Sequence, residues 1–135
     1  MQFDHHHLVR FAEVDAAGIV FFARAFEIAH AAFEGLLSEV GLPLAEILVT
    51  QPWIMPLVHA EADYKAPMRL GDKLVVGVRV ERIGRTSVSL RFEITGDQPH
   101  VVVRHVHVCM DRGSGRPIAI PAALRAAFAA YLIPS

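Results

Sequence analysis

The chain has little of what marks several large classes of protein. It contains one cysteine, Cys109, which excludes an internal disulfide framework and a Cys-x-x-Cys metal site. Thirteen Lys and Arg residues stand against fourteen Asp and Glu, so bulk positive charge does not attract nucleic acid. No apolar run approaches the roughly 18 residues that cross a bilayer, and the N-terminus, MQFDHHHLVRF, has no basic and apolar leader. We expect no nucleic-acid partner, no membrane association and a cytoplasmic location.

A large apolar fraction is present instead. It amounts to 53% of 135 residues, which is enough for a packed core and predicts one domain over residues 1–135. Residues 22–40 carry apolar side chains spaced by three or four positions, the pattern of a helix with one buried face. Gly41 and Pro43 then stop the helix, because glycine adopts the left-handed conformation common at helix ends. The many Phe and Ala residues predict a helix buried against a sheet.

The other segments alternate apolar and polar residues with period two, which indicates β-strands. The predicted strands are residues 3–11, 53–64 with an interruption near Pro56, 73–81, 87–94 and 102–110, and a short helix near 121–131 follows. Turns at Gly84 and Gly96-Asp97 join the last three strands into an antiparallel meander. One long helix beside one antiparallel sheet is an α+β layout. The helix covers one sheet face, so strand residues such as Val101 and Val103 predict cover from a homo-oligomer.

The segment with most chemical content is 10–22, just before the long helix. Asp15 and Gly18 lie close to a helix N-terminus, where unpaired N–H groups and the positive end of the dipole stabilise a developing oxyanion. A carboxylate beside such donors stays ionised and can act as nucleophile or general base. The alternative is that Asp15 only caps or shapes a turn, and the physical pattern alone favours that plainer role.

Two motifs carry a resemblance to a known family. Residues 15–22, Asp-Ala-Ala-Gly-Ile-Val-Phe-Phe, resemble the D-x-A-G-(I/V)-V-(F/Y) pattern of hotdog-fold acyl-CoA thioesterases, in particular the 4-hydroxybenzoyl-CoA thioesterase branch. Residues 63–74 are similar to the family's Y-x-x-P-x-x-x-G-D-x-L stretch. The resemblance covers about residues 3–130 in the same element order. It implies a hotdog fold, in which an antiparallel sheet wraps a long central helix, and thioester hydrolysis as the activity.

The resemblance also implies roles for individual residues. Asp15 would attack the thioester carbonyl or deprotonate a water that does, and the Phe22 N–H would polarise that carbonyl. Gly18 would let the chain turn closely beneath the thioester. Arg85 and Ser87 match the turn that holds the CoA phosphates, unless they only form a solvated turn. No cofactor and no metal are implied, and the family's sites are shared between subunits of a homodimer or homotetramer.

Four residues have both a substrate-binding and a packing interpretation. Trp53, Met55 and Pro56 are expected either in the wall of an acyl pocket or in the core. His30 stands where the branch carries an acid that accepts a hydrogen bond from the substrate's ring hydroxyl. Neutral imidazole lacks the charge-assisted grip of a carboxylate, so we expect no strong preference for 4-hydroxybenzoyl-CoA over benzoyl-CoA or a medium-chain acyl-CoA. The alternative is that His30 only packs or faces solvent.

His105 and His107 lie two apart on a predicted strand and share one face with Cys109, an arrangement that zinc could use. No third ligand has an obvious spacing. The pattern therefore favours an oligomer interface or a solvated face over a metal site for the two histidines. Cys109 is expected to be a small packing residue.

The predicted function is hydrolysis of the thioester of an aroyl- or acyl-CoA. One alternative is a non-catalytic hotdog protein that binds acyl-CoA or an acyl carrier, and another is a thioesterase that acts on acyl-carrier protein. A hotdog dehydratase is a third, but it usually has a histidine in the loop where this chain has Asp15.

Overall fold

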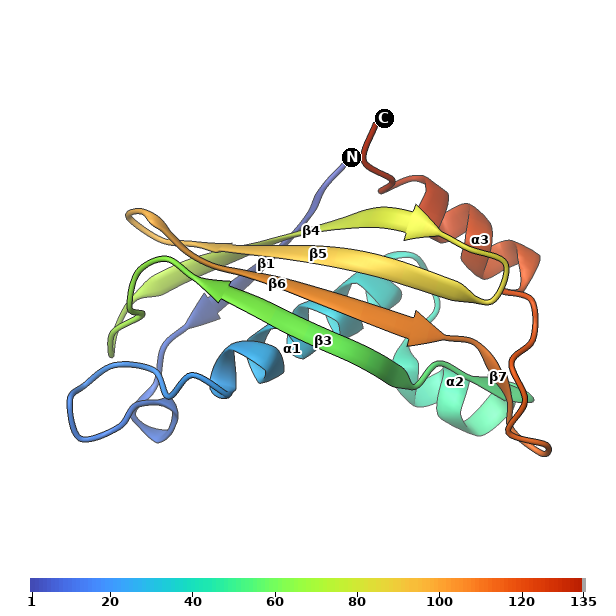
Figure 1. Ribbon diagram of the computed structural model, residues 1–135, viewed down its shortest axis with the longest axis horizontal. Helices are drawn as coiled ribbons and strands as arrows, with labels where there is room; N and C mark the ends of the chain where they lie inside the picture. Colours follow the sequence, from blue (N-terminus) through green and yellow to red (C-terminus); the bar gives the residue numbers. More distant parts are fainter. Residues whose placement is uncertain (135) are drawn as a thin grey trace.

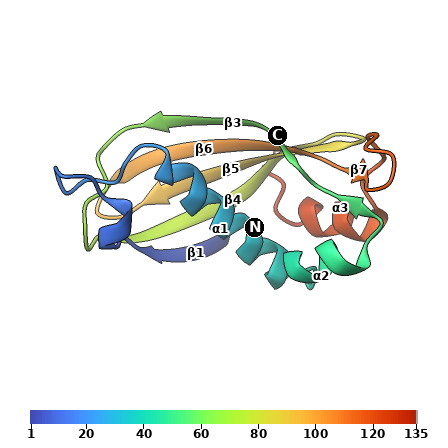
Figure 2. The same ribbon diagram turned by 90° about the horizontal axis from the view of Figure 1, so that it is seen from below.

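The computed structural model describes residues 1–134. Five strands form one antiparallel sheet in the order β1 (Phe3–Leu8), β4 (Lys73–Ile83), β5 (Ser87–Thr95), β6 (Pro99–Val108) and β3 (Leu57–Tyr64). The long helix α1 (Arg24–Glu39) lies along one face of this sheet (Figure 1), and seen from below the sheet curves around it (Figure 2). The predicted α+β class and hotdog architecture are confirmed.

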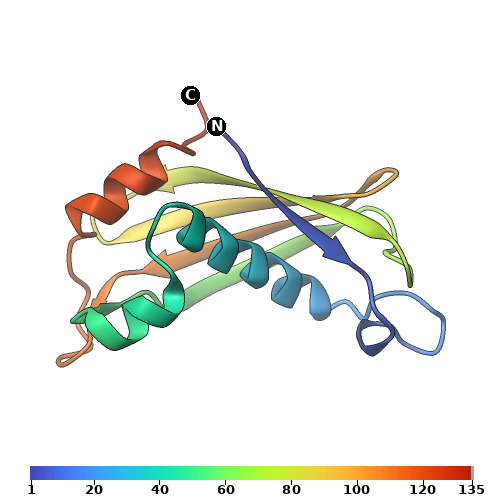
Figure 3. The ribbon, with the colours of Figure 1, turned by 180° about the vertical axis from the view of Figure 1, so that it is seen from behind.

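The smaller elements gather at the two ends of the sheet. The 3-10 turn η1 (Phe11–Glu13) follows β1, while α2 (Leu44–Thr50) and α3 (Ala122–Ala129) lie at the end where α1 finishes (Figure 3). Two short strands, β2 (Trp53–Ile54) and β7 (Met110–Asp111), pair as a separate ribbon near α2. Within residues 1–134 no helix is both long and apolar enough to span a bilayer.

Helix α1 starts two residues later than its periodicity predicts. Phe22, placed on the buried stripe by the sequence, is 60% exposed, so that part of the prediction is wrong. The cause is the preceding chain, which is held extended where Val20 donates to the Met68 carbonyl and Phe21 to the Glu13 carbonyl. The buried face carries Ala25, Ile28, Ala29, Ala32, Phe33, Leu36 and Leu37. Its alanines let the helix approach the sheet closely.

The ends of other elements also have local causes. Strand β1 stops at Leu8 rather than at residue 11, because the Val9 N–H leaves the ladder to donate to the Asp72 carbonyl. The interruption predicted near Pro56 is present, since β3 begins only at Leu57. Gly41 has φ +82°, the left-handed conformation predicted for the end of the long helix.

The two faces of the sheet differ in chemistry. The inner face is mostly apolar and faces α1, and it includes Val101 and Val103, which are 1% and 0% exposed. These two valines need no second subunit to cover them, so that expectation is wrong. The outer face carries ion pairs instead, for example Arg104 with Glu81 at 3.0 Å and with Asp63 at 3.3 Å. What stays open is the free edge of β3, where seven of eight residues are exposed.

Candidate active site

Asp15 lies in a tight turn between η1 and α1. Its N–H donates to the Ile19 carbonyl at 2.9 Å, and its own carbonyl accepts from the Gly18 N–H at 3.0 Å. One carboxylate oxygen accepts from the Ala17 N–H at 2.8 Å. Gly18 has φ +78°, which glycine adopts without strain. Asp15 therefore shapes its own turn, as its plainer interpretation predicts, and its exposed carboxylate is also accessible to a ligand.

The Asp15 turn forms one wall of an open cleft, and the segment just before α1 forms another. The cleft is lined by Asp15, Ile19, Val20, Phe21, Phe22, Tyr64, Lys65, Ala66, Pro67 and Met68. Helix α1 has Ala23 as its N-cap, with no side chain to cap it. Within residues 1–134 the N–H groups of Phe22 and Ala23 donate no hydrogen bond. The Asp15 carboxylate thus shares a cleft with Phe22, whose free N–H lies next to the positive end of a helix dipole, an arrangement suited to a developing oxyanion.

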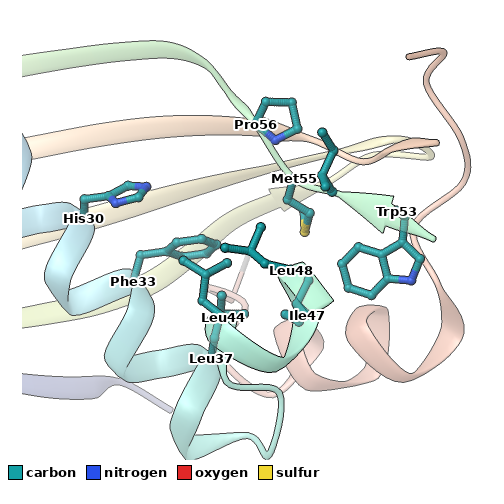
Figure 4. A pocket seen from close by; sticks show the side chains of 10 residues that line it. His30, Phe33, Leu37, Leu44, Ile47, Leu48, Trp53, Met55 and Pro56 are labelled. Carbon is teal, nitrogen blue, oxygen red and sulfur yellow. The ribbon is translucent and has the colours of Figure 1, made fainter. Parts of the chain in front are cut away.

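A second, apolar cavity of about 220 Å³ lies at the other end of α1 (Figure 4). Its lining is His30, Phe33, Leu37, Leu44, Ile47, Leu48, Trp53, Ile54, Met55 and Pro56. Trp53, Met55 and Pro56 all line the cavity, and Trp53 is also 7% exposed and part of the core, so both of its interpretations apply. Helix α2, which the sequence analysis missed, supplies three of the lining residues.

Three histidines meet at one side of this cavity. The rings of His105 and His107 each lie 6.0 Å, centroid to centroid, from that of His30. His105 and His107 are 1% exposed, so the expected interface or solvated face is wrong. The alternation of residues along the strand indicates that His105 and His107 share a face. It does not indicate that this face lies under α1. Cys109 on the same face is fully buried, as expected of a packing residue.

Burial and mutual repulsion determine the charge of these histidines. Burial, with nearby imidazoles as a smaller cause, lowers the pKa of His105 to about 4. Burial also lowers the pKa of His107 to about 4 although its Nδ1 contacts the Met55 carbonyl at 3.1 Å. That contact places the proton on Nδ1 and leaves Nε2 as a bare acceptor. No group of three or more His, Cys, Asp or Glu side chains in residues 1–134 is arranged to hold a metal ion.

The cleft and the cavity lie at opposite ends of β3. Tyr64, the last residue of the strand, lines the cleft, whereas Pro56, just before the strand, lines the cavity. Seven residue steps separate Leu57 from Tyr64, or about 23 Å. Arg85 and Ser87 lie at the β4–β5 turn, at the cavity end of the sheet (Figure 1). One chain therefore does not bring Asp15 together with Arg85.

Two contacts that the sequence analysis missed hold the walls of the cleft. The Glu13 carboxylate contacts His7 Nε2 at 2.9 Å and accepts from the Arg10 N–H at 2.9 Å, which ties the Asp15 loop to β1. The Tyr64 hydroxyl donates to the Phe22 carbonyl, 42 residues away in sequence. Periodicity carries no information about such distant partners. The Glu-x-Asp spacing of Glu13 and Asp15 was the one local feature that could have drawn attention to Glu13.

Comparison with known proteins shows the family of the chain. The family model of the Thioesterase-like superfamily matches residues 9–128. A 1,4-dihydroxy-2-naphthoyl-CoA hydrolase of Nostoc punctiforme is 34% identical over 116 residues, which are 84% of this chain and 78% of the relative.

Solved structures are similar over nearly the whole chain. A 1,4-dihydroxy-2-naphthoyl-CoA thioesterase from Synechocystis superposes with a TM-score of 0.89 at 27% identity, covering 96% of each chain. A gentisyl-coenzyme A thioesterase superposes with a TM-score of 0.83 at 26% identity, covering 93% of this chain and 98% of the other. The chain therefore belongs to the thioesterase-like superfamily and has the hotdog fold of its thioester hydrolases.

Proposed function

We propose that this protein hydrolyses the thioester of an aroyl- or acyl-CoA, with Asp15 as the catalytic carboxylate. The observation that carries the proposal is the shared cleft of the Asp15 carboxylate and the free Phe22 N–H at the start of α1. Hydrolase names among relatives, including one that is 34% identical, support the reaction type. A protein that only binds acyl-CoA has no need to place a carboxylate beside an oxyanion-stabilising donor.

The reaction adds water across the thioester. Asp15 either attacks the carbonyl carbon, giving an anhydride that water then opens, or removes a proton from the attacking water. In both routes the carbonyl oxygen gains negative charge as the tetrahedral intermediate forms, and the Phe22 N–H stabilises it. The C–S bond then breaks, the carboxylic acid leaves, and the CoA sulfur takes up a proton. No cofactor takes part.

The apolar cavity supports an apolar acyl or aromatic group as the part of the substrate that is recognised. Its walls are almost entirely hydrocarbon, with Trp53, Met55 and Pro56 on one side and α1 on the other. His30 is the polar residue of its lining, and it can offer a neutral acceptor to a substrate hydroxyl. We expect kcat/KM for 4-hydroxybenzoyl-CoA to exceed that for benzoyl-CoA by less than about a hundredfold, or 2.7 kcal/mol.

A homodimer would join the separated parts of the site. We propose that β3 pairs in antiparallel fashion with β3 of a second copy, since its free edge offers unpaired backbone groups. The two-fold axis reverses the strand, so the cleft of one subunit lies beside the cavity of the other. Arg85 of the partner subunit also comes to the cleft end, three to four strands away, or roughly 15–19 Å. The pantetheine arm of CoA can span that separation.

The test of this function is release of free thiol from a panel of aroyl-CoA, acyl-CoA and acyl-carrier-protein thioesters. Asp15→Asn keeps the size of the side chain and removes its charge, so kcat should fall at least about a hundredfold. Asp111→Asn, an exchange of the same kind in β7, serves as the control. Near-normal turnover by Asp15→Asn would refute the assignment, and binding without thiol release by the parent would favour the non-catalytic alternative. Faster release of thiol from acyl-carrier-protein thioesters than from CoA thioesters would identify acyl-carrier protein as the carrier of the substrate.

A further inference from the structure

Tyr64 makes a contact that neither the turn of Asp15 nor the cavity explains. It is the last residue of β3, and its hydroxyl donates to the carbonyl of Phe22 at the start of α1. Its ring lines the same cleft as Asp15. The contact joins the free edge strand to the segment that carries the proposed oxyanion donors.

The Phe22 carbonyl accepts a second hydrogen bond, from the Ala25 N–H at 3.3 Å. Two donors on one oxygen fix the plane of the Phe22–Ala23 peptide, whose own N–H belongs to Ala23. Hydrogen bonds accepted by a peptide carbonyl also polarise the N–H of the same peptide, because bonded chains strengthen one another. The free Ala23 N–H lies in this peptide and the free Phe22 N–H in the preceding one, so a rotation of the Phe22–Ala23 plane would turn one N–H away from the direction of the other.

We infer that Tyr64 is a positioning residue for the hydrolysis: its hydroxyl holds the Phe22–Ala23 peptide so that the free N–H groups stay aimed at the thioester carbonyl. This inference rests on the function proposed above. Tyr64 touches the backbone that binds the reacting oxygen and is not itself required to touch the substrate.

The protonation state of Tyr64 suits this role. Partial burial raises the pKa of its phenol above the ordinary value near 10, so the hydroxyl keeps its proton at neutral pH. A neutral hydroxyl can donate to a carbonyl, whereas a phenolate could only repel it.

The kinetic test is Tyr64→Phe, which removes the hydroxyl and keeps the ring. We expect kcat to fall about tenfold with KM within about twofold of the parent, because the lost interaction acts on the transition state. Tyr131→Phe is the matched control, since Tyr131 is the chain's other tyrosine and packs in the core beside α3. Equal kcat for Tyr64→Phe and the parent, or a raised KM with kcat unchanged, would overturn the inference.

A second measurement separates positioning from general stability. In the Asp15→Asn background, a bound aroyl-CoA keeps its thioester intact, and difference infrared spectroscopy reports the stretch of its carbonyl. Donors aimed at the oxygen lower that frequency, so adding Tyr64→Phe should move it back toward the value in water. An unchanged frequency would contradict the inference while leaving the role of Asp15 intact. Full activity of Asp15→Asn alone would instead refute the proposed function.

Discussion

At the scale of single residues, the Asp15 turn depends on a neighbouring carboxylate. Glu13 accepts hydrogen bonds from the Arg10 N–H and His7 within about 3 Å, and its side chain is only 17% exposed. The surface pair of Arg24 and Glu27 has a similar distance, 2.8 Å, but its side chains are 42% and 64% exposed. Solvent screens the second pair far more than the first.

We therefore predict that Glu13→Ala lowers the free energy of unfolding by about 1–2 kcal/mol, since it leaves partly buried donors without an acceptor. Glu27→Ala, the control, should cost at most about 0.5 kcal/mol. Urea denaturation followed by circular dichroism measures both values. Equal losses for the two variants would mean that the Glu13 contacts contribute no more than an exposed ion pair.

The buried histidines predict how stability changes with pH. In the unfolded chain His105 and His107 bind protons near pH 6.5, whereas in the folded chain they bind them only near pH 4. Between these values the unfolded state binds more protons, so stability rises with pH and falls as the solution is acidified. From pH 7.5 to 5 each histidine should cost about 2 kcal/mol.

The measurement is the unfolding free energy at several pH values for the parent and for His105→Gln. Between pH 7.5 and 5 the unfolding free energy of His105→Gln should fall less than that of the parent. The difference should be up to half of the fall that His105 and His107 together cause. His59→Gln is the control, because the His59 side chain is 59% exposed. A decline of the same size in the parent and in His105→Gln would rule out His105 as a source.

At the scale of elements, the regular segments were predictable and the short ones were not. The strands β4, β5 and β6 alternate over nine to eleven residues, long enough for periodicity to identify them. Helix α2 has only seven residues, so the helical spacing of Leu44, Ile47 and Leu48 covers too few positions for periodicity to identify it. Strands β2 and β7 have two residues each and depend on each other for pairing. The three residues that α2 adds to the cavity wall were therefore not identified from the sequence.

In the candidate site, too, some residues could be predicted from the sequence and others could not. Asp15, Gly18 and the start of the helix are neighbours in the chain, so a local motif identifies them together. The partners of Tyr64 and His107 are backbone carbonyls more than forty residues away, which only the folded arrangement of β3, β6 and α1 brings near.

The β4–β5 turn gives a prediction about CoA binding. The Arg85 guanidinium is exposed and makes no hydrogen bond or ion pair to any residue that the structure describes, so it is available to a phosphate. Arg85→Ala should raise KM with kcat little changed, because the contact is equally strong in the ground and transition states. The difference should shrink at high salt. Arg91→Ala is the control, since Arg91 is already paired with Glu93 at 2.8 Å. Equal KM for Arg85→Ala and the parent at low salt would exclude the contact.

At the scale of the whole molecule, the separation of Asp15 from Arg85 predicts complementation between subunits that carry different defects. Asp15→Asn and Arg85→Ala chains, co-expressed with different tags and purified through both, form mixed dimers. If the site is shared across β3, one site in each mixed dimer combines an intact Asp15 with an intact Arg85. The parent KM should then return with about half of the parent kcat.

Light scattering should accompany that experiment and give the mass of a dimer or tetramer. A mixed dimer that shows only the raised KM of Arg85→Ala would place each site within one subunit. A monomer with parental turnover would contradict the shared site altogether.

The wall that α2 contributes to the cavity has one fully buried side chain, Ile47, and is otherwise only partly buried against the core. Such a wall can shift, lengthen or change its apolar lining while α1 and the sheet keep their packing. Asp15 and the first turn of α1 lie at the far end of β3 and do not contact the residues that change. Within a lineage built on this plan, the chemistry and the choice of acyl group can be inherited separately. New substrates then require few mutations, and none of them needs to touch the catalytic end.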